Sequence, residues 1–559
     1  MSQASQVFGN RRQIIDEEAE AAPMSAARRL APSMARSAII VSVAFILSRL
    51  LGLMREVILA RAFATGPEMD AYVSAFRIPD LLFLTVMSGA FGAAFIPVFG
   101  DFITHGDERR AWRLASAVLT WSGITVVALS IVMFILARPL MYLVSPGFDR
   151  HTADIAVNLM RILLLSPVFL GLGIAAKGIL EAQHQFTLPA IAPLIYNIAI
   201  IIGALFFVDD FGIYAVGWAV IIGGLGHFLV QVPGLIRCGM RFKPTVSRQV
   251  EGLGEVLRLL GPRVIGLAAF QINFIAVTAF ASIAGPSGVS AINYSWQLLM
   301  LPHGVLALSI STVAFPALAA RYSTGDQIGF RDLLDRTMRP LLFLTIPASA
   351  GLLLLRKPIV QALYERGNFG AESTAFVIAP LAWFAVGLVG YGITEILTRV
   401  FYATRDTRTP VITGILTIVL NIILCALFVG SMDQAGLALA LSVTTAAEAV
   451  ILLFFLRHRI GNIVAPDFWP WLARVLAATA GMSAIVLLTV GPLESAMEAH
   501  AGELLVEYPL FLYAMAMYVV AFVVFALIFR IPELQAVVGK VAARLPGPAR
   551  SVLDKLGML

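Results

Sequence analysis

The sequence predicts an all-α polytopic membrane protein, and three observations favour this fold class. The 559 residues are 59% hydrophobic and only 13% charged, with a mean hydropathy of +0.87, whereas soluble domains contain about 25% charged residues. Apolar runs long enough to cross about 30 Å of hydrocarbon as helices recur along the whole chain. The short alternating segments that build a membrane β-barrel are absent from the sequence.

The apolar runs, separated by glycine, proline and polar residues, predict about fourteen transmembrane helices. We expect them near residues 35–63, 70–100, 111–144, 153–182, 187–208, 212–236, 254–284, 289–320, 331–355, 373–402, 409–430, 434–457, 468–490 and 507–530. Residues 1–33 are polar, carry both charge signs and lack a signal-peptide cleavage site. They are expected to form a disordered cytosolic leader, and residues 536–559 a cytosolic C-terminal tail.

Lysine and arginine residues are concentrated in alternate connections between the predicted helices. Most of them lie on the side of the N-terminus, and the opposite connections contain few. These few are Arg61, Arg138, Arg150, Arg356, Lys357 and Arg366. Because basic connections stay in the cytoplasm, both termini are expected to be cytoplasmic. This topology accounts for the net charge of +6 and the sequence pI of about 9.4, so no nucleic-acid partner is expected.

The second half of the chain weakly repeats the first. Three short motifs recur at one fixed offset of 219 residues. They are Gly66-Pro67, Pro97 and Gly106-Asp107 in the first half and Gly285-Pro286, Pro316 and Gly325-Asp326 in the second. Six predicted helices separate each motif from its repeat. An even number preserves orientation, so we expect two parallel six-helix lobes.

The repeat divides the chain into an N-lobe at residues 34–240 and a C-lobe at residues 241–460. A helix pair at residues 461–535 falls outside both lobes. Two parallel repeats usually enclose a site at their interface, which opens alternately to the two sides of the membrane. The organisation therefore predicts a transporter. No nucleophile triad, phosphate-binding loop or other catalytic motif favours an enzyme.

The first predicted helix carries charges where a membrane helix rarely tolerates them. Counted from Ser37 at 1.5 Å per residue, Arg49 lies about 18 Å into the helix, close to the midplane of the membrane. An arginine there costs at least ~2.5–3.5 kcal/mol and almost always faces protein or a wet cavity. Arg55 and Arg77 add two further guanidinium groups, whose planar forks fit the oxygens of a phosphate.

These three arginines predict a binding site for an anion with several oxygens. The residues expected to support the site are Ser48, Gly52, Glu56, Asp80 and Gln297. Glu56 alone cannot neutralise three guanidinium groups, although Asp80 can pair with one of them. The alternative is that these charges only pair with one another inside the helix bundle.

Three stretches of the first two helices resemble a known family. They are "SRLLGLMREVILARAFATG", "MDAYVSAFRIPDLL" and "SGAFGAAFIPVF", and they are similar to the MurJ/MviN family of lipid II flippases in the MOP exporter superfamily. The resemblance implies that the first-helix arginines meet the pyrophosphate of an undecaprenyl-linked cell-wall precursor, and that the last two helices form a groove for its lipid tail. It also implies a multi-pass protein of the bacterial inner membrane that flips lipid II by alternating access for peptidoglycan synthesis.

The sequence departs from this family at two places. Many members carry a basic residue shortly after the second-helix proline, where this chain has Phe83 and Leu84. Many also have charged residues in the eighth helix, where this chain has Trp296, Gln297 and Met300. Two alternatives stay open: a flippase for another lipid-linked oligosaccharide, or a non-transporting scaffold that recruits cell-wall synthesis enzymes. A drug or cation antiporter of the same architecture would need acidic residues in the N-lobe cavity instead.

The sequence contains few residues that indicate the energy source of transport. Glu395, Glu448 and Asn421 are possible coupling residues, although Glu395 can instead pair with Arg399 one helical turn away. A sodium site usually includes a carboxylate, and neither the eleventh helix nor residues 264–284 supply one. We expect no metal site and no cofactor, and either the membrane potential or an ion gradient as the driving force.

Overall fold

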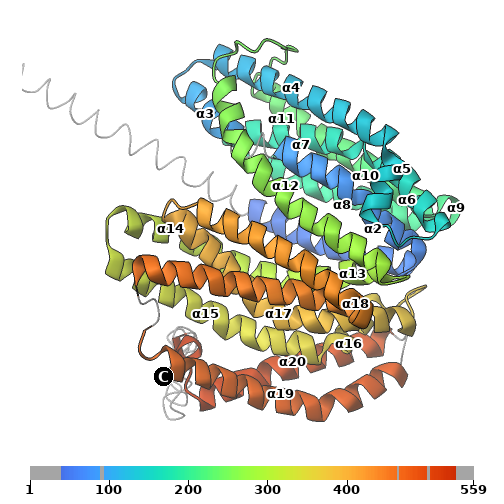
Figure 1. The fold of residues 1–559 in the computed structure, drawn as a ribbon, viewed down its shortest axis with the longest axis vertical. Helices are drawn as coiled ribbons and strands as arrows, with labels where there is room; N and C mark the ends of the chain where they lie inside the picture. The colour runs from blue at the N-terminus through green and yellow to red at the C-terminus, as the bar shows by residue number, and fades with distance from the viewer. Residues whose placement is uncertain (1–39, 89–93, 462–464, 500–503, 537–559) are drawn as a thin grey trace, which may run out of the picture.

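In the computed structural model of the chain, the residues described are 40–88, 94–461, 465–499 and 504–536. The leader predicted at residues 1–33 lies outside them, as does all but the first residue of the predicted C-terminal tail. The regular elements of the described residues are all helices (Figure 1). The predicted all-α fold class is therefore confirmed.

Eleven helical segments of the described residues are long and apolar enough to cross a membrane. One of them, α18 (Arg408–Ile460), covers two predicted helices. Its backbone breaks at Asp433, with φ 48° and ψ −135°, and this break divides α18 into two segments. The charged first helix (residues 40–63) and the shorter α2 (Pro67–Leu82) complete the predicted set of crossings.

Most of the other elements follow the predicted boundaries within a few residues, but α19 (Phe468–Ala499) continues well beyond the predicted end at residue 490. Those of the N-lobe are the π-helix η1 (Phe83–Ser88), α3 (Ile96–Thr104), α4 (Glu108–Ile135), α5 (Ala137–Val144), α6 (Arg150–Leu163), α7 (Ser166–Ala182), α8 (Thr187–Phe206), α9 (Val208–Phe211), α10 (Ile213–Leu229) and α11 (Val232–Arg237). Those after the N-lobe are α12 (Leu253–Ile283), α13 (Gly288–Pro302), the π-helix η3 (His303–Leu308), α14 (Ser309–Ser323), α15 (Gln327–Leu354), α16 (Arg356–Tyr364), α17 (Ala371–Ala403), α19 (Phe468–Ala499) and α20 (Leu504–Ile528). α16 is not among the predicted helices, because Arg356 and Lys357 end the apolar run of α15.

The two lobes have equivalent helices at the offset seen in the sequence. α4 and α15 each have 28 residues and begin 219 residues apart. Asp107 and Asp326 cap them, and each accepts a hydrogen bond from the backbone N–H three residues on. The preceding Gly106 and Gly325 have φ of 77° and 74°, which glycine adopts without strain. Because an aspartate cap satisfies a free N–H of the first turn, the repeated Gly-Asp motif sets the start of both helices.

The lobes share a hydrophobic core at one end of the molecule. This cluster combines N-lobe residues such as Leu59 and Met160 with C-lobe residues such as Tyr294 and Phe384. We call this end, where α2 and α13 begin, the joined end. At the opposite end, one cluster belongs to the N-lobe with the start of α12, and another lies within the C-lobe. Apolar packing between the lobes is therefore concentrated at the joined end.

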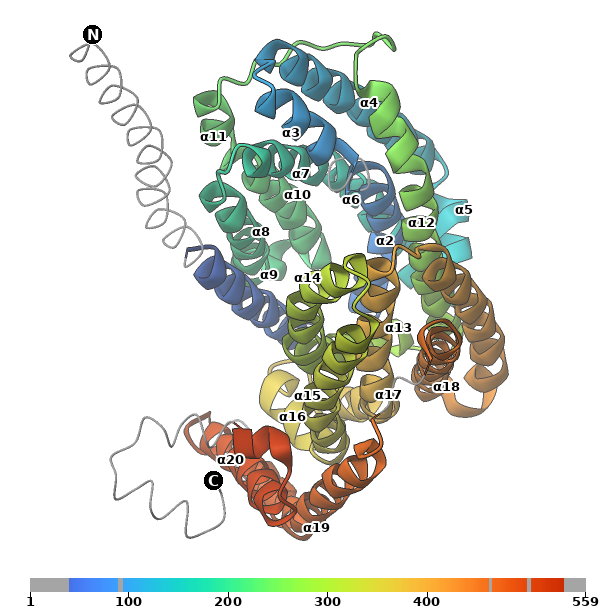
Figure 2. The same ribbon diagram turned by 90° about the vertical axis from the view of Figure 1, so that its left-hand side faces the viewer.

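The helix α12 connects the lobes along its length. Leu253 and Val256 at its start belong to the N-lobe cluster, whereas Val277 and Ala281 near its end belong to the shared cluster. Figure 2 shows α12 running from the neighbourhood of α4 toward α13. The first turns of α12 thus pack on the N-lobe, although the sequence repeat assigns the helix to the C-lobe.

The C-terminal helices α19 and α20 pack against the C-lobe on the side away from the N-lobe (Figures 1 and 2). One apolar cluster joins Trp471 and Met482 of α19 and Phe522 of α20 with Phe343 of α15. The hydroxyl of Tyr518 on α20 also donates a hydrogen bond to the carbonyl of Pro347. The helix pair therefore attaches to the C-lobe through α15, and an ion pair between Lys357 of α16 and Glu494 of α19 adds a second contact.

Candidate functional site

Arg55 of the first helix contacts both its neighbour Glu56 and the N-lobe helix α8. Its Nη2 lies 2.7 Å from Oε1 of Glu56, and its Nη1 donates to Oδ1 of Asn197 at 3.2 Å. Asn197 is itself held in place, because its Nδ2 donates to the carbonyl of Pro193 at 3.1 Å. The buried Nε of Arg55 has no hydrogen-bond partner among the described residues. The protein therefore satisfies this guanidinium only in part.

Arg77 of α2 reaches across the boundary between the lobes to α12. Its Nε donates to Oγ1 of Thr278 at 2.8 Å. Its guanidinium carbon lies 5.5 Å from the ring centroid of Phe274, a cation–π contact of about 0.5–2 kcal/mol. Both partners are neutral. Within the described part of the chain, no ion pair neutralises Arg77.

Arg49 is exposed, and the structure does not bring it into contact with Arg55 or Arg77. Its guanidinium carbon lies 5.3 Å from the ring centroid of Phe45, one turn earlier on the same helix, and it forms no ion pair with a described residue. A Cβ added at Gly52, three residues on, would meet nothing within 4 Å. The helix surface beside Arg49 is therefore open for the approach of another group.

The other predicted supporting residues differ in what they contribute. Glu56 is 7% exposed and pairs with Arg55. Asp80 interacts electrostatically with Arg77, although no ion pair joins them in the described residues. Gln297 is partly buried on α13 and forms no hydrogen bond with another described residue, and Ser48 is partly exposed on the first helix. The three arginines thus outnumber the two acids.

Polar contacts join the lobes at the joined end. Asp70 of α2 accepts hydrogen bonds from the backbone N–H groups of Ser287 and Ser290 at the start of α13, at 2.9 and 2.7 Å. The hydroxyls of Thr65 and Ser373 lie 2.9 Å apart across the same boundary. An aspartate at a helix N-terminus satisfies free N–H groups and complements the helix dipole. One lobe therefore caps a helix of the other.

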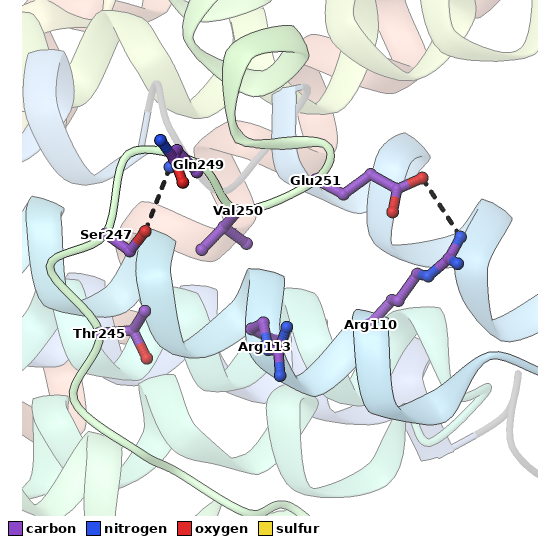
Figure 3. Close-up of a pocket in the computed structure, with 7 residues that line it drawn as sticks. All are labelled: Arg110, Arg113, Thr245, Ser247, Gln249, Val250 and Glu251. Atoms are coloured by element: carbon purple, nitrogen blue, oxygen red, sulfur yellow. Dashed lines mark hydrogen bonds and ion pairs between the residues drawn. The ribbon is translucent and has the colours of Figure 1, made fainter.

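A pocket of about 440 Å³ lies away from this boundary, between the start of α4 and the linker before α12 (Figure 3). Its lining residues are Arg110, Arg113, Thr245, Ser247, Gln249, Val250 and Glu251. Arg110 lies 3.1 Å from Asp107 and 3.2 Å from Glu251. These ion pairs fix the linker on the N-lobe. The pocket includes neither Arg55 nor Arg77.

The possible coupling residues all lie in the C-lobe. Glu395 and Arg399 form an ion pair of 2.9 Å, which confirms the pairing that the sequence favours for Glu395 over a coupling role. Nδ2 of Asn421 donates to Oδ1 of Asn273 at 2.9 Å. Glu448 forms no ion pair or hydrogen bond with a described residue. In the part of the chain that the structure describes, no group of His, Cys, Asp and Glu could hold a metal ion.

Two parallel repeats of membrane helices that meet at one end, with guanidinium groups at their boundary, define a membrane transporter of the two-lobed class. The family model described as "Lipid II flippase MurJ" matches residues 59–498 of the chain. The chain belongs to this family.

Relatives of known name are similar over most of their length. A lipid II flippase MurJ of Burkholderia cenocepacia is 32% identical over 432 residues, which cover 76% of this chain and 84% of that protein. A probable lipid II flippase MurJ of Buchnera aphidicola is 30% identical over 416 residues, which cover 74% of this chain and 81% of that protein.

Solved structures also resemble the fold. A lipid II flippase MurJ in an inward closed conformation matches with a TM-score of 0.74 and 26% identity, over 88% of this chain and 98% of that one. An inward-facing multidrug resistance transporter of the MATE family, in the MOP superfamily, matches with a TM-score of 0.65 and 17% identity, over 76% of this chain and 98% of that one. The second similarity concerns the fold alone.

Sequence reasoning missed the neutral residues that hold the arginines. Asn197 and Thr278 lie in long apolar helices. A lone polar side chain in such a helix needs a hydrogen-bond partner, so its presence in the sequence can indicate a contact with another polar group. Phe274 carries no such signal, since an apolar run is expected to contain aromatic residues. Asp70 precedes a run of buried residues in α2, but its partners on α13 follow only from the arrangement of the lobes.

Proposed function

We propose that this chain is a flippase that moves lipid II from the inner to the outer leaflet of the bacterial cytoplasmic membrane for peptidoglycan synthesis. The proposal is supported by membership of the MurJ family and by the chemistry at the boundary between the lobes. The observation that carries it is Arg77, whose guanidinium spans α2 and α12 and, within the described residues, has Thr278 as its hydrogen-bond partner and Phe274 as its cation–π contact. A charge held in this way is available to an anionic head group.

The charge balance favours a diphosphate over a neutral or cationic cargo. Arg55 pairs with Glu56 and Arg77 interacts electrostatically with Asp80, whereas Arg49 has no acidic partner among the described residues. A diphosphate offers several oxygens that can accept bidentate hydrogen bonds from guanidinium groups. In membrane surroundings such contacts replace the water that the charges lose. The three arginines would bind the diphosphate, with Glu56 and Asp80 as orienting groups.

Alternating access would follow from separating the lobes at one end while they close at the other. The connections on the side of the N-terminus contain most of the lysines and arginines, so we place both termini in the cytoplasm. The joined end then faces the periplasm. Asp70 and Thr65, which join the lobes at that end, would then hold the periplasmic side closed, as uptake of cargo from the inner leaflet requires.

The polyprenyl tail of the cargo would stay in the membrane beside α19 and α20. Exposed apolar residues on these helices include Leu487, Leu488 and Val520, and the pair attaches to the C-lobe on the side away from the N-lobe. Such a surface suits a hydrocarbon chain. The cargo is anionic, so the membrane potential can contribute about 2.3 kcal/mol per charge per 100 mV to its outward movement.

The proposal is tested by flipping of labelled lipid II in vesicles that contain the purified chain. The native protein should move the label between leaflets, and Arg49→Ala should slow this movement about tenfold or more, since a hydrogen bond to a charged group contributes about 1.5–3 kcal/mol. Arg237→Ala is the matched control, because Arg237 is an exposed arginine of α11 with no contact at the boundary between the lobes.

Two results would contradict the proposal. One is native protein that moves no lipid II in vesicles where it is folded and inserted. The other is Arg49→Ala, Arg55→Ala and Arg77→Ala proteins that all flip lipid II at the native rate, since the cationic residues at the boundary would then have no part in transport.

A further inference from the structure

Two acids of the C-lobe differ sharply in their surroundings. Oε1 of Glu395 lies 2.9 Å from Nε of Arg399 and accepts a hydrogen bond from the hydroxyl of Ser311 at 3.2 Å. Glu448 of α18 forms no ion pair or hydrogen bond with any described residue. One acid is therefore neutralised by its neighbours, whereas the other stays without a partner in an apolar helix.

Glu448 lies deep in the membrane-spanning part of the C-lobe. It is 12 residues from Ile460, where α18 ends, and 15 residues from the break at Asp433. At 1.5 Å per residue, these separations correspond to about 18 and 22 Å of helix. A charged carboxylate at such depth is costly unless it is paired, hydrated or neutralised by a proton.

The carboxyl group points between helices of the C-lobe. A Cβ added at Gly414, on the first segment of α18, would lie 3.9 Å from Oε1 of Glu448. The ionisable groups that interact electrostatically with Glu448 are Tyr391 and Tyr402, both on α17. The helices α12 and α13 also pack against α18, and within the described residues neither contributes an ion pair to Glu448.

Further buried polar groups extend from this position toward the boundary between the lobes. Nδ1 of His303 is buried with no hydrogen-bond partner among the described residues, and the buried hydroxyl of Tyr391 lies beside Thr445. The ring centroids of His303 and Tyr391 lie 6.2 Å apart, and Tyr391 also packs against Trp296 at 5.6 Å. His303 begins the π-helix η3, an irregularity that is frequent at functional sites. Polar groups of this kind need water, a ligand or a proton.

We propose that Glu448 is a proton-binding site of the C-lobe, which takes up and releases one proton in each transport cycle. On uptake an O–H bond forms at the carboxylate, and its charge falls from −1 to zero; on release the proton leaves to water. Tyr391 interacts with Glu448 and packs against His303 of η3, and His303 in turn interacts electrostatically with Glu395. Glu395 is not assigned the proton-binding role, because its Oε1 is already paired with Arg399 and Ser311.

In this proposal, protonation of Glu448 changes which arrangement of the two lobes is the more stable. The neutral carboxyl fits the packed contact of α17 and α18, whereas the ionised form requires water beside it. Loading from the periplasm and release to the cytoplasm would then couple inward proton movement to outward cargo movement. This coupling rests on the proposed flippase function, but the binding of a proton at Glu448 does not.

Carbodiimide labelling tests proton binding without any transport measurement. Dicyclohexylcarbodiimide reacts with protonated carboxyl groups in apolar surroundings, and mass spectrometry of the full-length chain in lipid nanodiscs locates the adduct. We expect an adduct at Glu448 that decreases as the pH is raised, and none at Glu395. Absence of an adduct at Glu448 across the pH range, or equal labelling of the two residues, would overturn the assignment.

Vesicles with an imposed pH gradient test the coupling. We expect the gradient to accelerate flipping of labelled lipid II by the native chain, Glu448→Gln to lose this acceleration, and Glu448→Asp to restore part of it. Glu251→Gln, which changes a surface carboxylate near α4, should respond as the native chain does. Acceleration that persists in Glu448→Gln, or is absent in the native chain, would overturn the coupling. A native chain that flips no lipid II would contradict the proposed function instead, and the labelling result would still stand.

Discussion

The two lobes have equivalent helices in α4 and α15 but carry different side chains at the boundary between them. At the offset of 219 residues, Arg55 and Arg77 of the N-lobe correspond to Phe274 and Trp296 of the C-lobe. The two aromatic rings contact each other at 5.6 Å, and Phe274 also lies beneath the guanidinium of Arg77. Where one lobe has two cations, the other therefore has two aromatic rings.

The repeat therefore retains residues that determine the backbone structure, whereas the residues proposed to contact the cargo differ between the lobes. The Gly-Asp cap recurs before α4 and before α15 with the same hydrogen bond, because both helices need the same start. The boundary residues do not recur. The N-lobe supplies the positive charge, and the C-lobe supplies aromatic packing and the proposed proton-binding carboxyl group of Glu448.

The largest effect is expected from locking the two lobes together. Thr65→Cys with Ser373→Cys, in a chain whose Cys238 and Cys425 are replaced by serine, should form a disulfide where the hydroxyls now lie 2.9 Å apart. The lock should abolish flipping of labelled lipid II, and a reductant should restore it. Each single cysteine variant serves as a control. Full flipping by the oxidised double variant would contradict movement of one lobe relative to the other at this end.

Removing charge from the N-lobe should have the next largest effect. Arg55→Ala with Arg77→Ala should weaken lipid II binding by about 100-fold or more, since each lost contact to a charged group contributes about 1.5–3 kcal/mol and 1.4 kcal/mol is tenfold. Phe274→Leu with Trp296→Leu, the equivalent pair of the C-lobe, should weaken binding less. Equal losses in the two double variants, measured by titration with labelled lipid II, would remove the distinction between the lobes.

A smaller effect is expected from the cap that one lobe provides for the other. Asp70→Ala leaves two backbone N–H groups of α13 without their acceptor, at about 1–3 kcal/mol for unsatisfied buried donors. The joined end should close less often, so the disulfide between positions 65 and 373 should form about tenfold more slowly. Ser74→Ala is the control, because Ser74 contacts Ser145 of its own lobe. An unchanged rate would mean that Asp70 does not hold the lobes together.

The smallest effect concerns the two equivalent caps within the lobes. Asp107→Ala and Asp326→Ala should each lower stability by about 0.5–2 kcal/mol, the usual contribution of an N-cap side chain. Thermal unfolding of the chain in detergent measures both. The two losses should be similar, because both caps bond to the N–H three residues on. A loss in only one variant would show that the lobes differ in backbone energetics as well as in chemistry.

Most of the fold follows from the sequence because membrane helices are specified locally. An apolar run must satisfy its own backbone within a helix, and glycine, proline and charged residues mark its ends. The break at Asp433 inside α18 falls between two predicted helices, because polar residues interrupt the apolar run there. The π-helices η1 and η3 could not be predicted, since their residues suit an ordinary helix equally well.

The site was predictable only where charge appears in an apolar run. Arg55 and Glu56 stand out on that ground, and the structure pairs them. The contact of Arg77 with Thr278 and Phe274 depends on how α2 meets α12, which no local pattern specifies. The contact of Arg49 with Phe45, four residues earlier on the same helix, is of a kind that local spacing allows, whereas its separation from Arg55 and Arg77 depends on the arrangement of the helices.

Discrimination between two lipids tests directly whether the N-lobe arginines bind a diphosphate. Binding of undecaprenyl diphosphate and of undecaprenol, which lacks phosphate, is compared for the native chain and for the Arg55→Ala, Arg77→Ala double variant. The native chain should prefer the diphosphate strongly, and the variant should bind the two lipids almost equally. An unchanged preference in the variant would contradict the assignment of the diphosphate to these arginines.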